Sequence, residues 1–353
     1  MLGRVGSSVG RLGVISANSG PNFSYTGTNT AFQSALTEAA YTGLVAGFSA
    51  PTYPQYWLRG ARYPSFLSMP GATCTRTGSR AGLDAAVIYP ANVARVSAGS
   101  GLRIHGSGTN LVRSSDAPPT QSFTVTATAH TLSLFGTGSV TLSGVATGTL
   151  VGTGASNRVS LTFTPTAGTL TLTVSGSVTF AQVETGTFAT DYIPNANTGA
   201  SSIAGADNVQ LAASALPTSG SVVFLADLPA QALPNATGLN SLFNWSGTMR
   251  LFSSTGGTRI EAGYTVGSPF IDGLTVGGAR RVAVAWNPGV SARMTANGSA
   301  VIVDTTIPGG ITTQPLFLGN RPALDLPLNG SFGVFAAYSG SPSDAQLQAM
   351  SAL

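Results

Sequence analysis

The feature that most constrains this chain is a strict alternation of apolar and hydroxyl-bearing side chains near its middle. In residues 121–130 (QSFTVTATAH), every second position from Phe123 onward is apolar and the positions between are threonine. Successive side chains of a β-strand point to opposite faces, so this spacing predicts a strand with one buried and one solvated face. We therefore expect an antiparallel β-sandwich with a threonine-rich outer face. The alternation returns at residues 161–163, 170–174 and 178–180.

A second alternating region starts at Val209 and continues toward the end of the chain. Its strongest part is residues 280–305, where valines alternate up to Trp286 and Asn297-Gly298 marks a tight hairpin. Near the C-terminus, Ser343 followed three positions later by Gln346 forms a capping box, which starts a helix. We expect a second sandwich that ends in a short helix.

Composition supports an all-β chain and excludes several classes of protein. The 353 residues are 42% hydrophobic and only 8% charged, with 45 glycines and one cysteine. All 16 basic residues are arginines and they are dispersed along the sequence, so we expect no nucleic-acid partner. We expect no membrane span, since no run of about 18 apolar residues occurs. A single cysteine, Cys74, excludes a disulfide framework and a multi-cysteine zinc site.

The N-terminal residues, 1 to about 60, are the least regular part. A Gly-Arg phrase around Arg4 is nearly repeated around Arg11, and its glycines disfavour a helix. We interpret this segment as an arm whose Arg4 and Arg11 contact a partner, and a loose tail is the alternative. Residues 29–41 predict a short helix, with Asn29 as its N-cap.

Several phrases of the sequence resemble bacteriophage tail-fibre, tail-spike and other virion surface proteins. They are "TCTRTG" at residues 73–78, "GTNLVRSS" at 108–115, "QVETGTFATDYIP" at 182–194 and "ADNV" at 206–209. This resemblance implies a carbohydrate-binding-module-like or jelly-roll sandwich followed by a concanavalin A-like or laminin G-like sandwich. Together with the turn-rich joint at residues 194–201, it places an attachment region at 1–70, the first sandwich at 71–195 and the second at 196–353.

The resemblance also implies a setting for the protein. Such appendages are anchored to capsid or tail proteins through the N-terminal region and contact host cell-surface polysaccharide. They are usually homo-oligomers, commonly trimers. The expected location is therefore the virion surface, after synthesis in the host cytoplasm, and no export signal would be needed.

Five aromatic residues are candidates for glycan contact. Three lie in the aromatic and proline-rich residues 51–64, which can form either a sugar platform or packing over a core or an interface, and packing is the favoured interpretation. Two lie in the C-terminal region. The candidates are Tyr53, Tyr56, Trp57, Trp245 and Tyr264.

We expect no catalytic residues, no metal site and no cofactor. Neither His105 nor His130 has another histidine or a cysteine near it in the sequence, and His130 is expected on the polar face of a strand. Neither Glu184 nor Glu261 begins the E-x-D-x-x-E pattern of concanavalin-like glucanases. The leading hypothesis is a non-enzymatic virion protein, with a capsular polysaccharide depolymerase and a ligand-free capsid cement as alternatives. Loop carboxylates leave catalysis or calcium binding open: Asp227, Asp272, Asp304 and Asp325.

Overall fold

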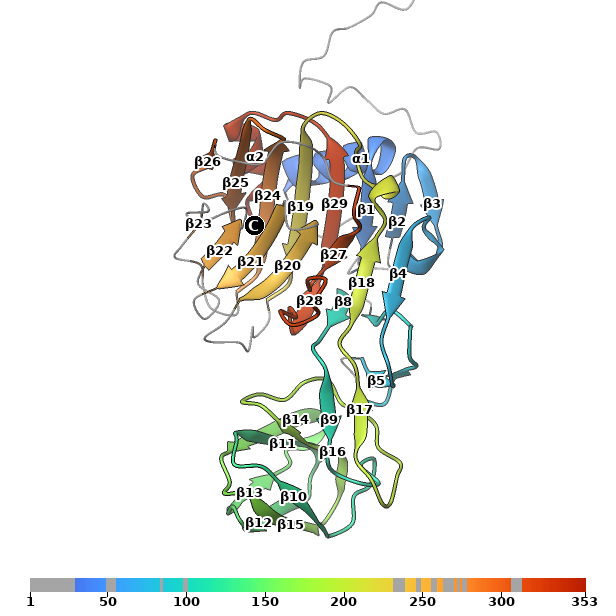
Figure 1. Cartoon of the computed structure of the whole chain (residues 1–353), viewed down its shortest axis with the longest axis vertical. Coiled ribbons are helices and arrows are strands. Elements are labelled where there is room, and N and C mark those ends of the chain that lie inside the picture. The colour runs from blue at the N-terminus through green and yellow to red at the C-terminus, as the bar shows by residue number, and fades with distance from the viewer. Residues whose placement is uncertain are drawn as a thin grey trace, which may run out of the picture.

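The computed structural model shows two β-sandwiches of unequal size joined by a neck (Figure 1). The all-β prediction is confirmed. Among the described residues, no helix is long and apolar enough to cross a membrane. Arg4, Arg11, Tyr53, Asp272 and Tyr264 lie outside the described residues. The structure describes residues 29–48, 55–82, 85–97, 101–230, 239–245, 249–254, 259–262, 270–271, 274, 278–305 and 313–353.

The large sandwich consists of two antiparallel sheets. Within the described residues, the first has the order β26-β25-β24-β19-β29-β1-β2-β3 and the second β23-β22-β21-β20-β27-β18-β4. The first contains β1 (Leu44–Gly47), β2 (Gln55–Leu58), β3 (Ala61–Tyr63), β19 (Val222–Leu228), β24 (Arg280–Asn287), β25 (Ser291–Ala296), β26 (Ile302–Asp304) and β29 (Val334–Ser339). The second contains β4 (Ala72–Thr75), β18 (Asn208–Leu211), β20 (Asn240–Trp245), β21 (Met249–Ser254), β22 (Arg259–Ala262), β23 (Phe270–Ile271) and β27 (Leu316–Leu318).

Two helices, α1 (Thr30–Thr42) and α2 (Asp344–Ser351), cover the outer face of the first sheet (Figure 1). Both predicted helix starts are confirmed. The Asn29 side chain accepts a hydrogen bond from the Phe32 amide at 2.9 Å, and the capping box of Ser343 and Gln346 is present. Their apolar faces pack against one side of the sheet while its other side faces the inter-sheet core. The central strands β19, β24 and β29 of the first sheet are therefore buried on both faces.

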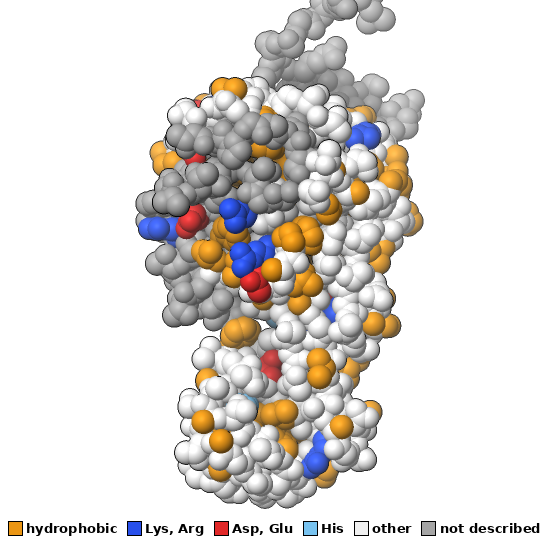
Figure 2. Space-filling view, in the orientation of Figure 1, with side chains coloured by type: hydrophobic (Ala, Val, Ile, Leu, Met, Phe, Trp, Pro, Cys, Tyr) orange, Lys and Arg blue, Asp and Glu red, His pale blue; other side chains and the backbone are white. Residues whose placement is uncertain are grey.

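The small sandwich confirms the alternation prediction. Its core contains Val125, Leu132, Leu170 and Leu172, which are almost fully buried. One described sheet contains β10 (Gln121–Val125), β15 (Gly168–Ser175), β12 (Ser139–Gly144) and β13 (Gly148–Val151); the other contains β14 (Gly154–Phe163), β11 (His130–Gly136) and β16 (Val178–Thr185). The visible surface of this body carries few charged side chains (Figure 2).

Two details at the start of the small sandwich differ from expectation. The first strand ends at Val125, because residues 126–129 turn the chain into β11. His130 is the first residue of β11, is only 1% exposed and stacks on Phe163 with ring centroids 5.9 Å apart. It therefore belongs to the buried side of its strand and not to a polar face.

The sheets do not follow the expected boundaries at residues 70 and 195. Strand β1 lies between β2 and β29, with Val45 opposite Ala336, and β4 pairs with β18, with Cys74 opposite Val209. Residues 30–48 and 55–75 thus belong to the large sandwich and do not form a separate attachment region. The small sandwich is inserted between β9 (Gly108–Asn110) and β17 (Ser202–Ala204), which pair with each other.

The neck contains these two strands and several short elements. Strand β8 (Gly101–Ile104) joins the neck to the large sandwich. It pairs with β28 (Gly330–Phe332), which directly precedes β29 of the large sandwich. Figure 1 shows β9 and β17 side by side as the chain enters and leaves the small sandwich. The remaining described elements are β5 (Arg80–Ala81), β6 (Ile88–Tyr89), β7 (Val96–Ser97), and the 3₁₀ turns at Phe66–Ser68 and Ala213–Ala215.

Candidate functional site

The structure separates Tyr56 and Trp57, because neighbouring residues of β2 point to opposite faces of the sheet. Tyr56 is 3% exposed and packs against Phe48 and Phe66, with centroid distances of 5.7 and 6.2 Å. Trp57 is half-buried on the other face, beside the cluster that includes α1. The two rings therefore do not form one glycan platform.

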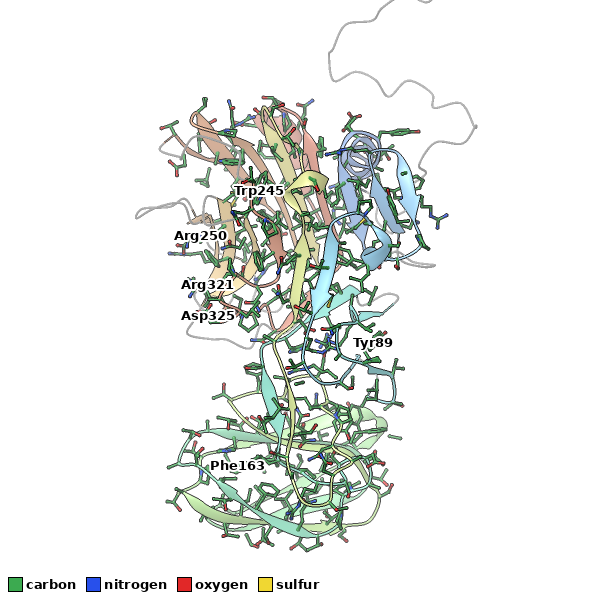
Figure 3. The ribbon with its side chains drawn as sticks, turned by 45° about the vertical axis from the view of Figure 1, so that its right-hand side comes forward. Tyr89, Phe163, Trp245, Arg250, Arg321 and Asp325 are labelled. Atoms are coloured by element: carbon green, nitrogen blue, oxygen red, sulfur yellow. The ribbon has the colours of Figure 1, made fainter. Side chains whose placement is uncertain are left out.

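Trp245 is fully buried, and its assignment as a glycan contact is wrong. It packs in the inter-sheet core with its ring centroid 5.6 Å from that of Trp286. Its indole nitrogen donates a hydrogen bond to the Gln314 carbonyl at 2.9 Å. Figure 3 labels this residue inside the large body, among the strands. Both its apolar surface and its polar atom are thus satisfied within the fold.

A groove of about 780 Å³ lies at the edge of the large sandwich, where the chain crosses from β3 to β4. We call it the Tyr63 groove. Its lining is mainly apolar and includes Arg62. The principal wall residues are Tyr56, Tyr63, Phe66, Leu67, Val93 and Val96.

The β2–β3 hairpin positions the two tyrosines of this groove. Arg59 and Gly60 have φ values of +47° and +83°, the left-handed pair that a two-residue turn requires. The resulting register places Tyr56 directly opposite Tyr63, so both side chains occupy the same face. Tyr56 forms the buried floor, where burial raises the pKa of its phenol, and Tyr63 is the more accessible ring.

The groove suits a ligand that has an apolar face and a polar rim. Leu67 and Val93 are 39% and 37% exposed, so they offer apolar surface at the groove. A volume of about 780 Å³ lies within the range of small-molecule sites, and aromatic walls with few polar groups are typical of them. Of the candidates that lie within the described residues, Tyr56 alone lines this groove. Tyr63 was not chosen as a candidate, although it lies in the same aromatic segment.

A second groove, of about 520 Å³, lies at the start of α2 and is mostly polar. Arg293 crosses it, donating to Asp344 Oδ1 at 2.9 Å and to the Pro342 carbonyl at 2.6 Å. The guanidinium is thus already neutralised by a carboxylate. Its other lining residues include Ser221, Asn287, Ser291, Ser343 and Gln346.

The neck holds a buried ionic cluster that sequence spacing did not reveal. Asp207 accepts from Arg76 NH1 and Arg95 NH2, both at 2.6 Å. Asp191, at the exit from the small sandwich, accepts from Arg95 and from Arg103 Nε, the latter at 3.0 Å. Burial alone would raise the pKa of both carboxyls, but the neighbouring cationic side chains outweigh it and hold the pKa of each below its ordinary value.

The remaining sequence candidates for acid chemistry are placed in structural roles or at the surface. Asp227 accepts from Arg281 Nε at 3.0 Å inside the large sandwich, and exposed Asp325 pairs with Arg321 four residues earlier (Figure 3). Glu184 is buried and accepts from the Thr190 amide and hydroxyl at 2.7 Å each. Within the described ranges, no three metal-ligating side chains gather into a metal site.

Comparison with known proteins shows no relative by sequence. The chain matches no protein-family model, and no curated protein matches it. Solved structures similar in fold include the botulinum neurotoxin serotype D binding domain, with 13% identity, a TM-score of 0.31, and coverage of 40% of this chain and 39% of that one.

Two further solved structures also match part of the chain. One is Domain 4 of AbnA, an extracellular arabinanase from Geobacillus stearothermophilus, in complex with arabinotriose: 17% identity, a TM-score of 0.31, and coverage of 47% of this chain and 83% of that one. The other is the binding domain of Paraclostridial Mosquitocidal Protein 1, with 10% identity, a TM-score of 0.26, and coverage of 40% and 42%. This chain spans about two fifths of the toxin domains that it matches.

Proposed function

We propose that this chain is a non-enzymatic surface protein of a bacteriophage or phage-like particle, and that its large sandwich binds host-surface glycans in the Tyr63 groove. The observation that carries the glycan proposal is the partly exposed Tyr63 ring in a mainly apolar groove at the edge of the large sandwich. Tyr56, opposite Tyr63, is buried and supports the groove without offering a stacking face. A sugar ring has a face of C–H groups and a rim of hydroxyls. An aromatic wall beside exposed polar groups complements both.

The viral setting rests on the sequence resemblance. The structure supports treating the resembling phrases as one unit, because they meet in space. Arg76 of "TCTRTG", Asp191 of "QVETGTFATDYIP" and Asp207 of "ADNV" belong to one ionic cluster. Asn110 of "GTNLVRSS" donates to the Ala181 and Ile193 carbonyls at the same junction. Phrases that are far apart in the sequence thus meet at the junction between the two sandwiches. This supports treating them as one structural unit that joins the two modules.

The glycan proposal is tested with the full chain on host capsular polysaccharide. We expect Tyr63→Ala to weaken binding about tenfold, because loss of one aromatic stack removes roughly 1 kcal/mol or more. Tyr41→Ala is the matched control, since Tyr41 is an exposed tyrosine on α1 and lies outside the groove. Equal binding of the polysaccharide by both variants would show that the glycan does not bind in the Tyr63 groove.

Two parallel measurements address the alternative functions. Release of new reducing ends from the polysaccharide would replace the binding proposal with a depolymerase. Particle incorporation without any glycan binding would favour a cement protein. The attachment proposal for Arg4 and Arg11 is tested by deleting residues 1–28, because a longer deletion would remove α1 and β1 from the large sandwich. We expect this truncated chain to fold and bind glycan but to be absent from particles.

A further inference from the structure

Arg80 is a buried cation without a carboxylate partner. It lies on β5 in the neck and is 0% exposed. One terminal nitrogen donates to the Gly106 carbonyl at 2.9 Å and reaches the Ala204 carbonyl at 3.5 Å. Its Nε and its other terminal nitrogen have no partner among the described residues. Burial and then the charge of Arg95 lower the pKa of Arg80 to about 10, so the group is still protonated at neutral pH.

The carboxylates near Arg80 are occupied by other donors. Asp207 accepts from Arg76, Arg95 and the His105 amide, and Asp191 accepts from Arg95 and Arg103. The hydrogen bonds to Glu184 come from Thr190 and Gln182. In the described part of the neck and the adjoining end of the small sandwich, five guanidinium groups therefore accompany three carboxylates. They are Arg76, Arg80, Arg95, Arg103 and Arg158, with Glu184, Asp191 and Asp207.

Arg103 and Arg158 are only partly buried, whereas Arg76, Arg80 and Arg95 are buried, and of these three only Arg80 makes no ion pair among the described residues. A buried cation is unfavourable unless a counter-charge accompanies it. Buried polar groups without a protein partner commonly face a bound ion or water. Arg95 has a further unpartnered N–H, its Nε, and is also fully buried. Two buried arginines whose charges repel each other thus each carry at least one unpartnered N–H group.

We propose that the neck binds one small inorganic anion, chloride in solution, held by the guanidinium of Arg80 and shared with Arg95. Arg80 lies in a packed interior: a methyl group on Gly108 would lie 3.3 Å from the Arg80 Nη2 that donates to the Gly106 carbonyl. A monoatomic ion is the smallest anion that could meet the two unpartnered nitrogens of this side chain. The bound ion would link the entry strand of the small sandwich to its exit segment.

The proposal predicts a halide-dependent stability of the full chain. At constant ionic strength, replacing sodium gluconate by sodium chloride or bromide should raise the melting temperature saturably, by about 2–4 °C. Arg80→Met should abolish this dependence. Arg321→Met is the control, because Arg321 is a surface arginine paired with Asp325, and it should retain the full halide effect. Equal melting temperatures in gluconate and in halide would overturn the proposal.

A second measurement needs no variant and holds if Arg80→Met fails to fold. Crystals of the full chain grown in sodium bromide should show an anomalous scattering peak in contact with the Arg80 guanidinium. Bromide found only at surface arginines would mean adventitious binding and would overturn the proposal. A water molecule at Arg80, or a stabilisation produced by sulfate and not by halides, would overturn it equally.

Discussion

His105 Nε2 lies 3.0 Å from Asp191 Oδ2, and this contact connects the strand region leading into the small sandwich with the segment leaving it. The imidazole is almost fully buried and its Nδ1 has no partner among the described residues. We place the proton on Nε2, where it faces Asp191 Oδ2 and leaves Nδ1 bare, although the Arg103 guanidinium, which can only donate, lies 3.2 Å from the same nitrogen. The ring is therefore buried without charge beside Arg103, Arg95, Asp191 and Asp207.

Acid should destabilise the protein through this histidine. Burial, together with Arg103 and Arg95, lowers the pKa of His105 from 6.5 to about 4, although Asp191 opposes the shift. Between these values the unfolded chain binds a proton that the folded chain does not, so the free energy of unfolding falls as pH decreases from 6.5 to 4. Asp191, with a depressed pKa, adds a further loss below about pH 4. Urea unfolding from pH 7.5 to 4.5 measures this slope, and His105→Gln should flatten it. Parallel curves for both proteins would contradict the assignment.

Removing the charge of Asp191 should be costly. Asp191→Asn leaves the buried Arg95 and the mostly buried Arg103 short of a counter-charge, and we expect a loss of about 3–5 kcal/mol in the free energy of unfolding. The matched control is Asp325→Asn, which breaks the solvent-exposed pair with Arg321 and should leave the melting temperature nearly unchanged. Calorimetry of the three proteins compares them directly. Equal effects of the two substitutions would show that the neck cluster carries no special stability.

Two glycines with nearly equal backbone angles should tolerate alanine very differently. Gly101 has φ +86°, and a Cβ there would lie 1.9 Å from the Phe332 carbonyl oxygen of the adjacent strand. Gly60 has φ +83°, but nothing lies within 4 Å of the corresponding position. Gly60→Ala should cost about 1–2 kcal/mol for the left-handed backbone alone. Gly101→Ala should cost at least about 4 kcal/mol, because the two strands must separate. Chemical denaturation measures both, and similar losses would refute the close contact.

The buried position of Trp245 predicts a stability effect and not a specific binding effect. Trp245→Ala removes a core ring that packs against Trp286 and Phe224, and should cost about 3–5 kcal/mol. Trp57→Ala, at a half-buried position beside α1, should cost less. Denaturant unfolding gives the two values. If the Trp245→Ala protein kept its stability but lost glycan binding, and Trp57→Ala did not, Trp245 would be a glycan contact and not a core residue.

Local patterns predicted the local structure well. The alternation around Phe123, the turn at Asn297-Gly298 and the capping box at Ser343 depend on residues close in sequence. The capping box is present, and the alternation holds as far as Val125. The turn joins β25 to β26, but the pair nearest to it, Met294 and Ile302, leaves a longer loop than the expected tight hairpin. Alternation shows which residues share a face with Trp286, but not whether that face meets solvent, helices or the other sheet. The first sheet is covered on both sides, so apolar residues occupy both faces and the alternation of apolar and polar residues is less regular.

The insertion and the neck could not be predicted from spacing. Strand β1 has only four residues and finds its partner, β29, near the other end of the chain. Dispersed arginines gave no sign of a cluster, yet Arg76, Arg95 and Arg103 meet around two aspartates once the chain is folded. The Tyr63 groove was partly predicted: the aromatic segment was identified, but the register that places Tyr63 beside Tyr56 comes only from the hairpin.

The pairing of β1 with β29 also sets an order of events on the ribosome. Strand β1 cannot pair with β29 until residues near Ala337, the partner of Leu44, have been synthesised. Strands β10 to β16, in contrast, have all their strand partners within one continuous segment. Contacts so distant along the chain form slowly, and a nascent chain that lacks them exposes apolar strands. We therefore expect the small sandwich to fold during translation and the large one only after the last strands emerge, which makes truncated products prone to aggregate.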